Sequence, residues 1–377
     1  MSLLNINNVT RIYMSKLLSQ GGFGCVFFPG ISCDGKSQTN KSIVTKLQKK
    51  DLTADNEINI GKLIKTIKNY SFYFLPIISH CPIEIRDVDK KIISKCNVVN
   101  ADTSDYILMD IPYVNNKPFF EVLIDTSNGK KQTLIRYISS YKYLLHAILL
   151  LLEHNIVHYD LKGENILFNI DLMEPQIIDF GISIPMMQVN NTNLKDYFYV
   201  FAPEYYLWPL EIHIINYLLH YDMELNKVSA ENISELYTSN NKALTIFSPD
   251  FIEQYKQACV KECLKYVGQS KDMVIKELMK FYKTWDNYSL SILYLRVYYY
   301  FFPTGFHRNS LLINFSQLLL LNINPNPSKR LSINDTLKRF TELFYMDGNT
   351  DTYVNIILQM DYDEEMTTNK IKEDILN

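Results

Sequence analysis

The chain has 377 residues, of which 47% are hydrophobic, and its formal net charge at pH 7 is −3. A chain of this length and composition can bury a large core, in one two-lobed domain or in two domains. A net charge so close to zero provides no overall basic field, so we expect neither nucleic acid nor an anionic membrane surface as a partner.

The N-terminus and the cysteines bear on the cellular compartment. Residues 1–8 lack the basic region and apolar block of a secretion signal. The most apolar runs, 144–152 and 290–302, fall short of the roughly 20 residues that a membrane-spanning helix needs. The six cysteines form no Cys-x-x-Cys pair and no dense framework. We therefore expect free thiols, a reducing cytoplasmic location and no membrane insertion.

A glycine-rich turn between two strands is the first predicted element. Residues 12–18 lead into Ser19, and a strand that contains Val26 follows the turn. Glycines let the backbone approach phosphate oxygens without a Cβ in the way, and an aromatic residue at the tip can close over them. The turn residues are Gly21, Gly22, Phe23 and Gly24.

The next strand carries a lysine. Residues 42–47 alternate and are rich in β-branched side chains, which predicts a strand with Lys46 on the face opposite its neighbours. Apolar residues at helical spacing follow, on a predicted helix that also carries Asp55 and Glu57. The predicted strand therefore supplies an ammonium group, and the predicted helix after it supplies two carboxylates.

The middle of the chain alternates between apolar and polar segments. Residues 77–99 predict strands with an extended loop, and residues 106–110 predict a buried strand. A polar loop is expected over 115–131 and a helix over 133–153. The buried strand contains Met109 and Asp110 and leads to Pro112.

The densest polar stretch runs from His158 to Asn165, between two apolar segments. It places a carboxylate, an ammonium and a carboxamide close together, on Asp160, Lys162 and Asn165, and Asp179-Phe180-Gly181 follows. Phosphoryl transfer explains such a set: one carboxylate accepts the proton of the attacking hydroxyl, a lysine neutralises the moving phosphoryl group, and Asn and Asp hold Mg²⁺.

These motifs resemble those of the protein kinase family, whose loop reads His-Arg-Asp-Leu-Lys-x-x-Asn; here Tyr159 replaces the arginine. The resemblance implies that Asp160 orients and deprotonates the acceptor hydroxyl and that Lys162 stabilises the transferring phosphoryl group. Asn165 and Asp179 would be the metal ligands. ATP and Mg²⁺ are the implied cofactors, and proteins are the implied substrates.

The same resemblance implies an ATP site earlier in the chain. The glycine turn matches the kinase Gly-x-Gly-x-x-Gly-x-Val pattern, with Ser19 at its first glycine. Lys46 would hold the α- and β-phosphates and pair with Glu57, although Asp55 is an alternative partner. Met109 would be the gatekeeper. The adenine would contact the main chain of Asp110 to Pro112.

Later segments also match kinase motifs. Ala202-Pro203-Glu204 resembles the end of the activation segment, where Glu204 would pair with Arg330, and Asp286 would brace the backbone of the catalytic loop. Glu204 and Asp286 lie much farther apart than is usual in the family. We therefore expect an insertion over about 206–282, with extra helices packed on the large lobe.

The resemblance implies an α+β, two-lobed kinase-like fold: a small β-rich N-lobe over 1–112 and a large helical C-lobe over 113–377 that contains the insertion. Helical insertions, Tyr159 and the Lys-Gly-Glu-Asn loop are similar to kinases of large DNA viruses, which would place the protein in host cytoplasm or in the virion. The insertion could also serve a protein partner.

Three functions are compatible with these motifs. Lys162 is the choice of serine/threonine kinases, which favours an ATP- and Mg²⁺-dependent serine/threonine protein kinase. A pseudokinase that binds partners through its insertion is the alternative, favoured by Ser19, Tyr159 and the short interval between Lys46 and Glu57. A small-molecule kinase would lack Glu204, Asp286 and Arg330 in these roles.

Tyr159 also predicts how the activation segment is held. It carries no charge for a phosphate to neutralise, so we expect activity without phosphorylation of Thr192. Packing of an aromatic run would hold the segment instead. The run comprises Tyr197, Phe198, Tyr199 and Phe201, and Tyr197 lies where serine/threonine kinases place a threonine that contacts the catalytic Asp.

Overall fold

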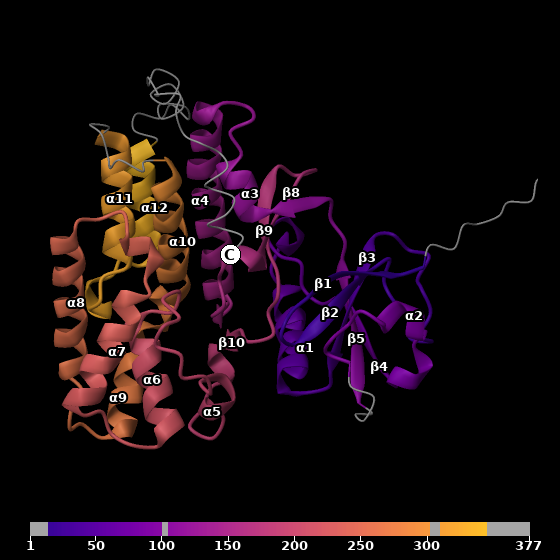
Figure 1. Cartoon of the computed structure of the whole chain (residues 1–377), viewed down its shortest axis with the longest axis horizontal. Coiled ribbons are helices and arrows are strands. Elements are labelled where there is room, and N and C mark those ends of the chain that lie inside the picture. The colour runs from indigo at the N-terminus through magenta and orange to yellow at the C-terminus, as the bar shows by residue number, and fades with distance from the viewer. Residues whose placement is uncertain (1–13, 100–104, 302–309, 345–377) are drawn as a thin grey trace, which may run out of the picture. The chain divides into compact units, whose positions relative to one another are not determined.

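The computed structural model describes residues 14–99, 105–301 and 310–344 (Figure 1). The described chain divides into two compact units. Unit 1 is built from residues up to 66, residues 75–115 and residues 179–181, and unit 2 from residues 67–74, 116–178 and those after 181.

A five-stranded antiparallel sheet forms the frame of unit 1, with the strand order β1-β2-β3-β5-β4. The predicted hairpin, lysine strand and buried strand are all present, which confirms those three predictions. The strands are β1 (Lys16–Gln20), β2 (Gly24–Phe28), β3 (Ile43–Lys49), β4 (Ser79–Ile83) and β5 (Tyr106–Pro112).

Helix α1 (Leu52–Ile64) follows β3 directly. Asp51 caps its N-terminus, because the carboxylate accepts a hydrogen bond from the backbone N–H of Ala54 at 2.9 Å. Ile60 and Ile64 are fully buried, as the helical spacing predicts. The segment predicted as strands with an extended loop contains β4, the short 3₁₀-helix Ile85–Asp87 and the short helix α2 (Lys90–Ile93).

Two disulfides cross-link unit 1. Cys25 is bonded to Cys96, and Cys33 to Cys81. The predicted free thiols are therefore wrong for four of the six cysteines, because pairs separated by 71 and 48 residues leave no local spacing signal. Disulfides persist in oxidising surroundings, so the cysteines no longer support a reducing location.

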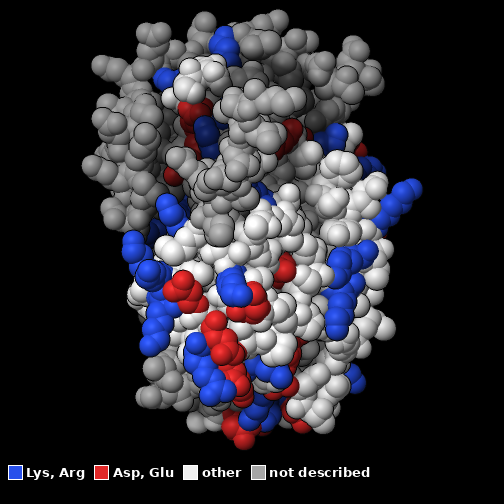
Figure 2. Space-filling model, turned by 90° about the vertical axis from the view of Figure 1, so that its right-hand side faces the viewer, with Lys and Arg blue, Asp and Glu red and all other residues white. Residues whose placement is uncertain are grey.

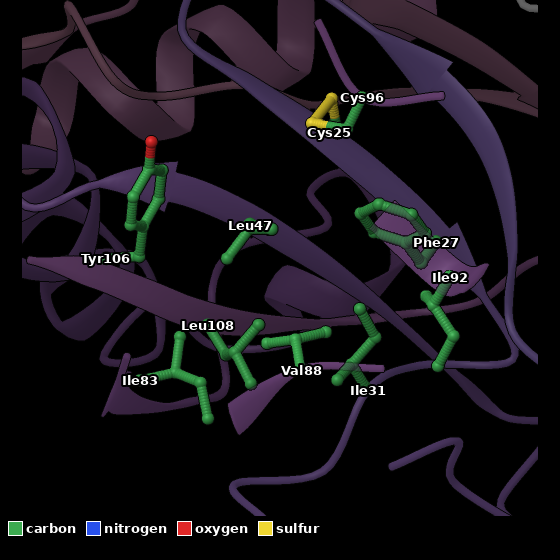
Figure 3. Close-up of a cluster of buried hydrophobic side chains, with 10 residues drawn as sticks. All are labelled: Cys25, Phe27, Ile31, Leu47, Ile83, Val88, Ile92, Cys96, Tyr106 and Leu108. Carbon is green, nitrogen blue, oxygen red and sulfur yellow. A yellow bond between two sulfur atoms is a disulfide. The ribbon is translucent and has the colours of Figure 1, made fainter. Parts of the chain in front are cut away.

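The Cys25–Cys96 disulfide belongs to the apolar core of unit 1 (Figure 3). Side chains from β2, β3 and β5 pack here with those of the segment after β4. Burying these side chains is the main favourable contribution to the folding of a small unit. The other members of the cluster are Phe27, Ile31, Leu47, Ile83, Val88, Ile92, Tyr106 and Leu108.

Unit 2 is mainly helical. Helices α4, α10, α11 and α12 pack on one another (Figure 1). Two small sheets, β6-β8-β9 and β10-β7, carry the loops that follow α4. The strands are β6 (Asn116–Pro118), β7 (Ile156–Val157), β8 (Ile166–Asn169), β9 (Glu174–Ile177) and β10 (Ile184–Pro185). The helices are α3 (Phe119–Ile124), α4 (Lys130–Glu153), α5 (Leu194–Tyr197), α6 (Leu210–Tyr221), α7 (Lys227–Ser239), α8 (Pro249–Leu264), α9 (Lys271–Leu278), α10 (Trp285–Phe301), α11 (Ser310–Asn322) and α12 (Ile333–Phe344).

Buried tyrosines join α4 to α10. The hydroxyl of Tyr137 donates to the carbonyl of Tyr294 at 2.5 Å, and Tyr294 in turn hydrogen-bonds Ser140 at 2.7 Å. The ring of Tyr141 packs edge-on against Tyr294 at 4.8 Å. Each tyrosine thus buries a large apolar ring while its polar tip is satisfied.

The extra helices predicted after the activation segment are present and pack on the rest of unit 2. Helices α7 and α8 pack on each other, and the hydroxyl of Ser248 caps α8 by accepting a hydrogen bond from the N–H of Phe251 at 3.2 Å. The hydroxyl of Tyr255 on α8 donates to the carbonyl of Ile323 at 2.8 Å. These contacts attach the pair of helices α7 and α8 to the residue that follows α11.

Charged side chains of both signs are mixed on the face shown in Figure 2. This agrees with the near balance of 38 Lys and Arg against 41 Asp and Glu. Over the described residues, we find no helix that has both the length and the apolar character needed to cross a membrane.

Reduction of the disulfides should destabilise unit 1. Loss of a native disulfide typically costs about 2–5 kcal/mol, because the unfolded chain regains conformational freedom. We expect a reductant to lower the midpoint of the unit 1 transition by at least about 8 °C in calorimetry of the full chain. A variant with Ser at positions 25, 33, 81 and 96 should not respond to reductant. An unchanged midpoint in the wild type would contradict this prediction.

Candidate active site

Lys46 lies at the centre of an ion cluster in unit 1, in which Lys46 and Glu57 are buried. Its Nζ is 2.8 Å from Oε2 of Glu57 on α1 and 3.1 Å from Oδ1 of Asp179. Glu57, not Asp55, is therefore the helix carboxylate that pairs with the lysine. Asn56 on the same helix donates to the carbonyl of Gly181 at 2.9 Å, which ties the Asp-Phe-Gly segment to α1.

Two carboxylates share one ammonium in this cluster. Burial lowers the pKa of Lys46, but the charges of Glu57 and Asp179 outweigh that effect and leave the pKa above its usual value. Burial raises the pKa of Glu57, and the neighbouring Lys46 opposes the rise. Lys46 thus stays protonated and faces the carboxyl groups of Glu57 and Asp179.

The glycine turn joins β1 to β2, and the N–H of Gly21 donates to the carbonyl of Gly24 at 2.9 Å. A Cβ on Gly24 would lie 2.7 Å from the carbonyl oxygen of Leu47, so only glycine fits there. No heavy atom lies within 4 Å of a Cβ built on Gly22, and Phe23 is 44% exposed at the tip. In the sheet register Val26 lies opposite Lys46.

The predicted hinge residues lie at the end of β5. Met109 is fully buried. The carboxylate of Asp110 accepts hydrogen bonds from Thr45 at 2.7 Å and from Ser79 at 2.8 Å, and its carbonyl accepts one from the N–H of Ile78. Asp110 is thus held by neighbouring strands of the sheet, and Pro112 is the last residue of β5.

In unit 2, the loop between β7 and β8 brings three polar side chains together. Oδ2 of Asp160 accepts hydrogen bonds from Nζ of Lys162 at 2.7 Å and from Nδ2 of Asn165 at 2.9 Å. A Cβ on Gly163 would lie 1.9 Å from the ring of Phe120, so only glycine fits at position 163. The loop therefore places an acid, an ammonium and an amide within hydrogen-bonding distance.

Asp286 braces this loop, as predicted. Its buried carboxylate accepts hydrogen bonds from the backbone N–H of His158 at 2.7 Å and of Tyr159 at 3.0 Å. Tyr159 has a φ of 70°, a conformation that is unfavourable for a bulky residue and persists only where its surroundings hold it. Trp208 supplies a third restraint, because its Nε1–H donates to the carbonyl of Tyr159 at 2.6 Å.

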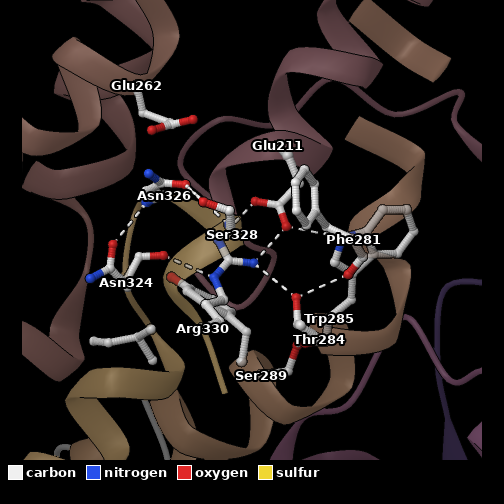
Figure 4. A network of polar contacts seen from close by, with 12 residues as sticks. Glu211, Glu262, Phe281, Thr284, Trp285, Ser289, Asn324, Asn326, Ser328 and Arg330 are labelled. Carbon is white, nitrogen blue, oxygen red and sulfur yellow. Dashed lines mark hydrogen bonds and ion pairs between the residues drawn. The ribbon is translucent and has the colours of Figure 1, made fainter. Parts of the chain in front are cut away.

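Arg330 pairs with Glu211 and not with Glu204, which corrects the sequence prediction (Figure 4). Both side chains are 1% exposed, and the guanidinium donates to both carboxylate oxygens of Glu211, at 2.5 and 2.8 Å. Trp285 donates to the same carboxylate at 3.0 Å. Glu204 is exposed, whereas Glu211 lies in the first turn of α6, where it is buried.

The activation segment therefore extends to Glu211, and the extra helices are α7 to α9. The prediction relied on a three-residue pattern, Ala-Pro-Glu, which cannot reveal where the next helix begins. Sequence reasoning also missed Trp208, which directly precedes Pro209-Leu210-Glu211. Proline is common where a helix begins, so this proline was the available signal.

The residue that contacts the carboxylate of Asp160 is Tyr205 and not Tyr197, a second correction with the same origin. The Tyr205 hydroxyl donates to Oδ1 of Asp160 at 2.7 Å. Tyr197 ends the short helix α5. The activation segment ends at Glu211 and not at Glu204. The residue that contacts Asp160 therefore also lies several residues later in the chain than predicted.

A comparison with protein families agrees with this geometry. Residues 14–206 match the model of the protein kinase domain. The chain belongs to the protein kinase family. Its fold is the α+β kinase fold, with a β-sheet N-terminal part and a helical C-terminal part. The matched residues include the Lys46 cluster and the loop of Asp160, whereas Glu211, Asp286 and Arg330 follow them.

Replacing Glu211 by Gln should destabilise unit 2 strongly. The change leaves the Arg330 guanidinium buried without its counter-charge, which typically costs about 3–5 kcal/mol. Chemical unfolding of the full chain would measure the loss. The matched control is Glu204→Gln, which should change the unfolding free energy by no more than about 0.5 kcal/mol, because Glu204 is exposed. A larger effect at Glu204 would contradict the assigned ion pair.

Proposed function

We propose that this protein kinase is catalytically active and transfers the γ-phosphoryl group of ATP to serine or threonine hydroxyls of protein substrates. The observation that carries the proposal is the complete set of charged groups: the Lys46, Glu57 and Asp179 cluster in unit 1 and the Asp160 and Lys162 pair in unit 2. Kinase chemistry consists of positioning and charge stabilisation, and these side chains have the required types.

Each residue has one role in this proposal. Asp160 orients the acceptor hydroxyl and takes its proton, and Lys162, bonded to the same carboxylate, stabilises the charge of the transferring phosphoryl group. Lys46 binds the α- and β-phosphates, and Glu57 keeps its side chain extended. The glycine turn, Gly21 to Gly24 with Val26, covers the phosphates, and the end of β5 from Met109 to Pro112 receives the adenine.

Asn165 and Asp179 are the residues that would hold Mg²⁺. The donor set fits, because carboxylate and amide oxygens are ligands of this cation in kinases. The carboxylate of Asp179 is 39% exposed and so can reach a ligand. Bound Mg²⁺ would neutralise phosphate charge.

The pseudokinase alternative rests on the departures at Ser19 and Tyr159 and on the short interval between Lys46 and Glu57. Neither departure disturbs the charged groups: Lys46 reaches Glu57 at 2.8 Å, and the Tyr159 backbone is held by Asp286 and Trp208. The main support for an inactive scaffold is therefore weakened. A role of α7 to α9 in binding a protein partner is compatible with either function.

The Asp160→Asn variant should lose at least about 100-fold in turnover, because an amide cannot accept the hydroxyl proton. Affinity for ATP should change less than about twofold, since the proposed role of Asp160 belongs to the transition state. The assay is transfer of γ-labelled phosphate to generic protein substrates, with phosphoamino acid analysis to distinguish serine and threonine from tyrosine.

The matched control for this assay is Glu153→Gln, the same chemical change at the exposed end of α4, which should retain wild-type turnover. Absence of transfer by the wild type would favour the pseudokinase. Wild-type turnover by Asp160→Asn would remove Asp160 from the mechanism, and a collapse of ATP affinity would make it a structural residue.

Phosphorylation of Thr192 should be dispensable for activity. Tyr159 is buried, packs edge-on against Phe198 at 5.6 Å and stacks on Trp208 at 4.7 Å, so packing holds the segment without a phosphate. Phe201 packs similarly against α6, and Tyr199 is 44% exposed. Phosphatase-treated Thr192→Ala should stay within about tenfold of untreated wild type, equivalent to about 1.4 kcal/mol of barrier.

The comparison variant for the activation segment is Phe198→Ala, which removes the packing and should reduce turnover far more than Thr192→Ala does. Equal or greater loss at Thr192 would indicate that a phosphate orders the segment and that a basic residue receives it.

A further inference from the structure

The tip of the glycine turn has little packing of its own. Space is open around Gly21 and Gly22, and the side chain of Phe23 is 44% exposed. Strand β1, which leads into the turn, lies at one edge of the five-stranded sheet, and its last residue, Gln20, is exposed. A segment with so few contacts opens easily unless other bonds restrain it.

Two bonds to a neighbouring segment restrain the base of the turn. In the register of β1 with β2, Gln20 lies opposite Cys25, and this pair closes the turn. Cys25 is bonded to Cys96 by a disulfide. The side-chain carbonyl of Gln20 accepts a hydrogen bond from the backbone N–H of Asn97 at 3.3 Å. Both residues of the closing pair are therefore tied to two adjacent residues of one segment.

That segment is itself fixed to the core of unit 1. Cys96 is buried and belongs to the same apolar cluster as Phe27 and Ile92 (Figure 3). Two residues further on, the carbonyl of Val98 accepts a hydrogen bond from the hydroxyl of Tyr106 on β5 at 3.4 Å. The base of the turn is thus connected to the core and to an inner strand of the sheet, in addition to its own two strands.

The second disulfide of unit 1 has no such relation to the turn. The Cys33–Cys81 bond joins the segment after β2 to β4, which lies at the opposite edge of the sheet from β1. The two disulfides span 71 and 48 residues of sequence. Because the entropy of closing a loop changes slowly with its length, the loss of either bond should destabilise the unit to a similar extent.

We propose that the Cys25–Cys96 disulfide, together with the bond between Gln20 and Asn97, is a positioning element that holds the glycine turn in the conformation that binds the phosphates of ATP. The inference rests on the proposed role of the turn in covering those phosphates. A loop that is already held in its bound conformation loses less entropy on binding. Removal of the disulfide therefore weakens the binding of the phosphates, while the adenine contacts at the end of β5 stay as they are.

The test is the Cys25→Ala/Cys96→Ala double variant of the full chain. Calorimetric titration would measure the Kd for ATP with Mg²⁺ and, separately, the Kd for adenosine. We expect the Kd for ATP to rise at least about fivefold, because the released turn has to be ordered on binding. The Kd for adenosine should change by less than about twofold, since adenosine has no phosphates for the turn to cover.

The matched control is Cys33→Ala/Cys81→Ala, which removes the other disulfide and should leave both Kd values within about twofold of the wild type. Thermal unfolding would show that both double variants are folded. An unchanged Kd for ATP in Cys25→Ala/Cys96→Ala would overturn the inference. Equal rises for ATP and adenosine, or the same rise in the control pair, would also overturn it, because the effect would then be a general loss of stability.

If Cys25→Ala/Cys96→Ala does not fold, the Gln20→Leu variant decides. Gln20 is exposed and the change leaves the disulfide intact, so the chain should stay folded while the closing pair loses its bond to Asn97. The Kd for ATP should then rise at least about twofold with that for adenosine unchanged. An unchanged Kd for ATP would overturn the inference.

The failure of this inference is distinguishable from the failure of the proposed function, because binding is measured apart from transfer. A wild type that binds ATP but transfers no phosphate would refute the proposed activity, and the Kd values of the variants would still decide the inference. A wild type that binds no ATP would refute both. An active wild type with equal Kd values for ATP in all variants would refute the inference alone.

Discussion

The catalytic loop depends on one buried carboxylate. Asp286 accepts hydrogen bonds from the N–H groups of His158 and Tyr159, and those bonds hold Tyr159 in a left-handed conformation. A buried charge is unfavourable unless hydrogen bonds satisfy it, so the loop and the carboxylate stabilise each other. Burial raises the pKa of Asp286, and the two backbone donors oppose that rise. The position of Asp160 follows from this arrangement, because it is the next residue in the chain.

Neutral packing complements these polar restraints. Tyr159 occupies the position where the family has an arginine, and its ring joins those of Phe198, Trp208 and Trp285. Dispersion and burial thereby hold these rings against the loop. Trp208 takes part in both kinds of restraint, since it stacks on Tyr159 and also donates to its carbonyl. The conformation of the segment is thus tied to that of the loop.

The two units are stabilised in different ways. Unit 1 is small, so its apolar core is limited. Its two disulfides add stability because they restrict the conformations of the unfolded chain. Unit 2 buries many aromatic side chains and contains the ion pair between Glu211 and Arg330. The carboxylate of Glu211 also accepts a hydrogen bond from Trp285. Such a pair contributes mainly through the penalty for breaking it, because either charge alone would be buried without compensation.

The sequence by itself determined the features whose information is local. The glycine turn, the strand of Lys46 and the long helix before the catalytic loop were predicted correctly, because hydrophobic periodicity and turn residues are patterns of a few neighbouring residues. Only the tertiary structure decided which of several chemically equivalent residues meets a distant partner. Glu211 and not Glu204 pairs with Arg330, Tyr205 and not Tyr197 reaches Asp160, and four of the six cysteines form disulfides. Each choice depends on burial and proximity across long chain separations, which a local pattern does not contain.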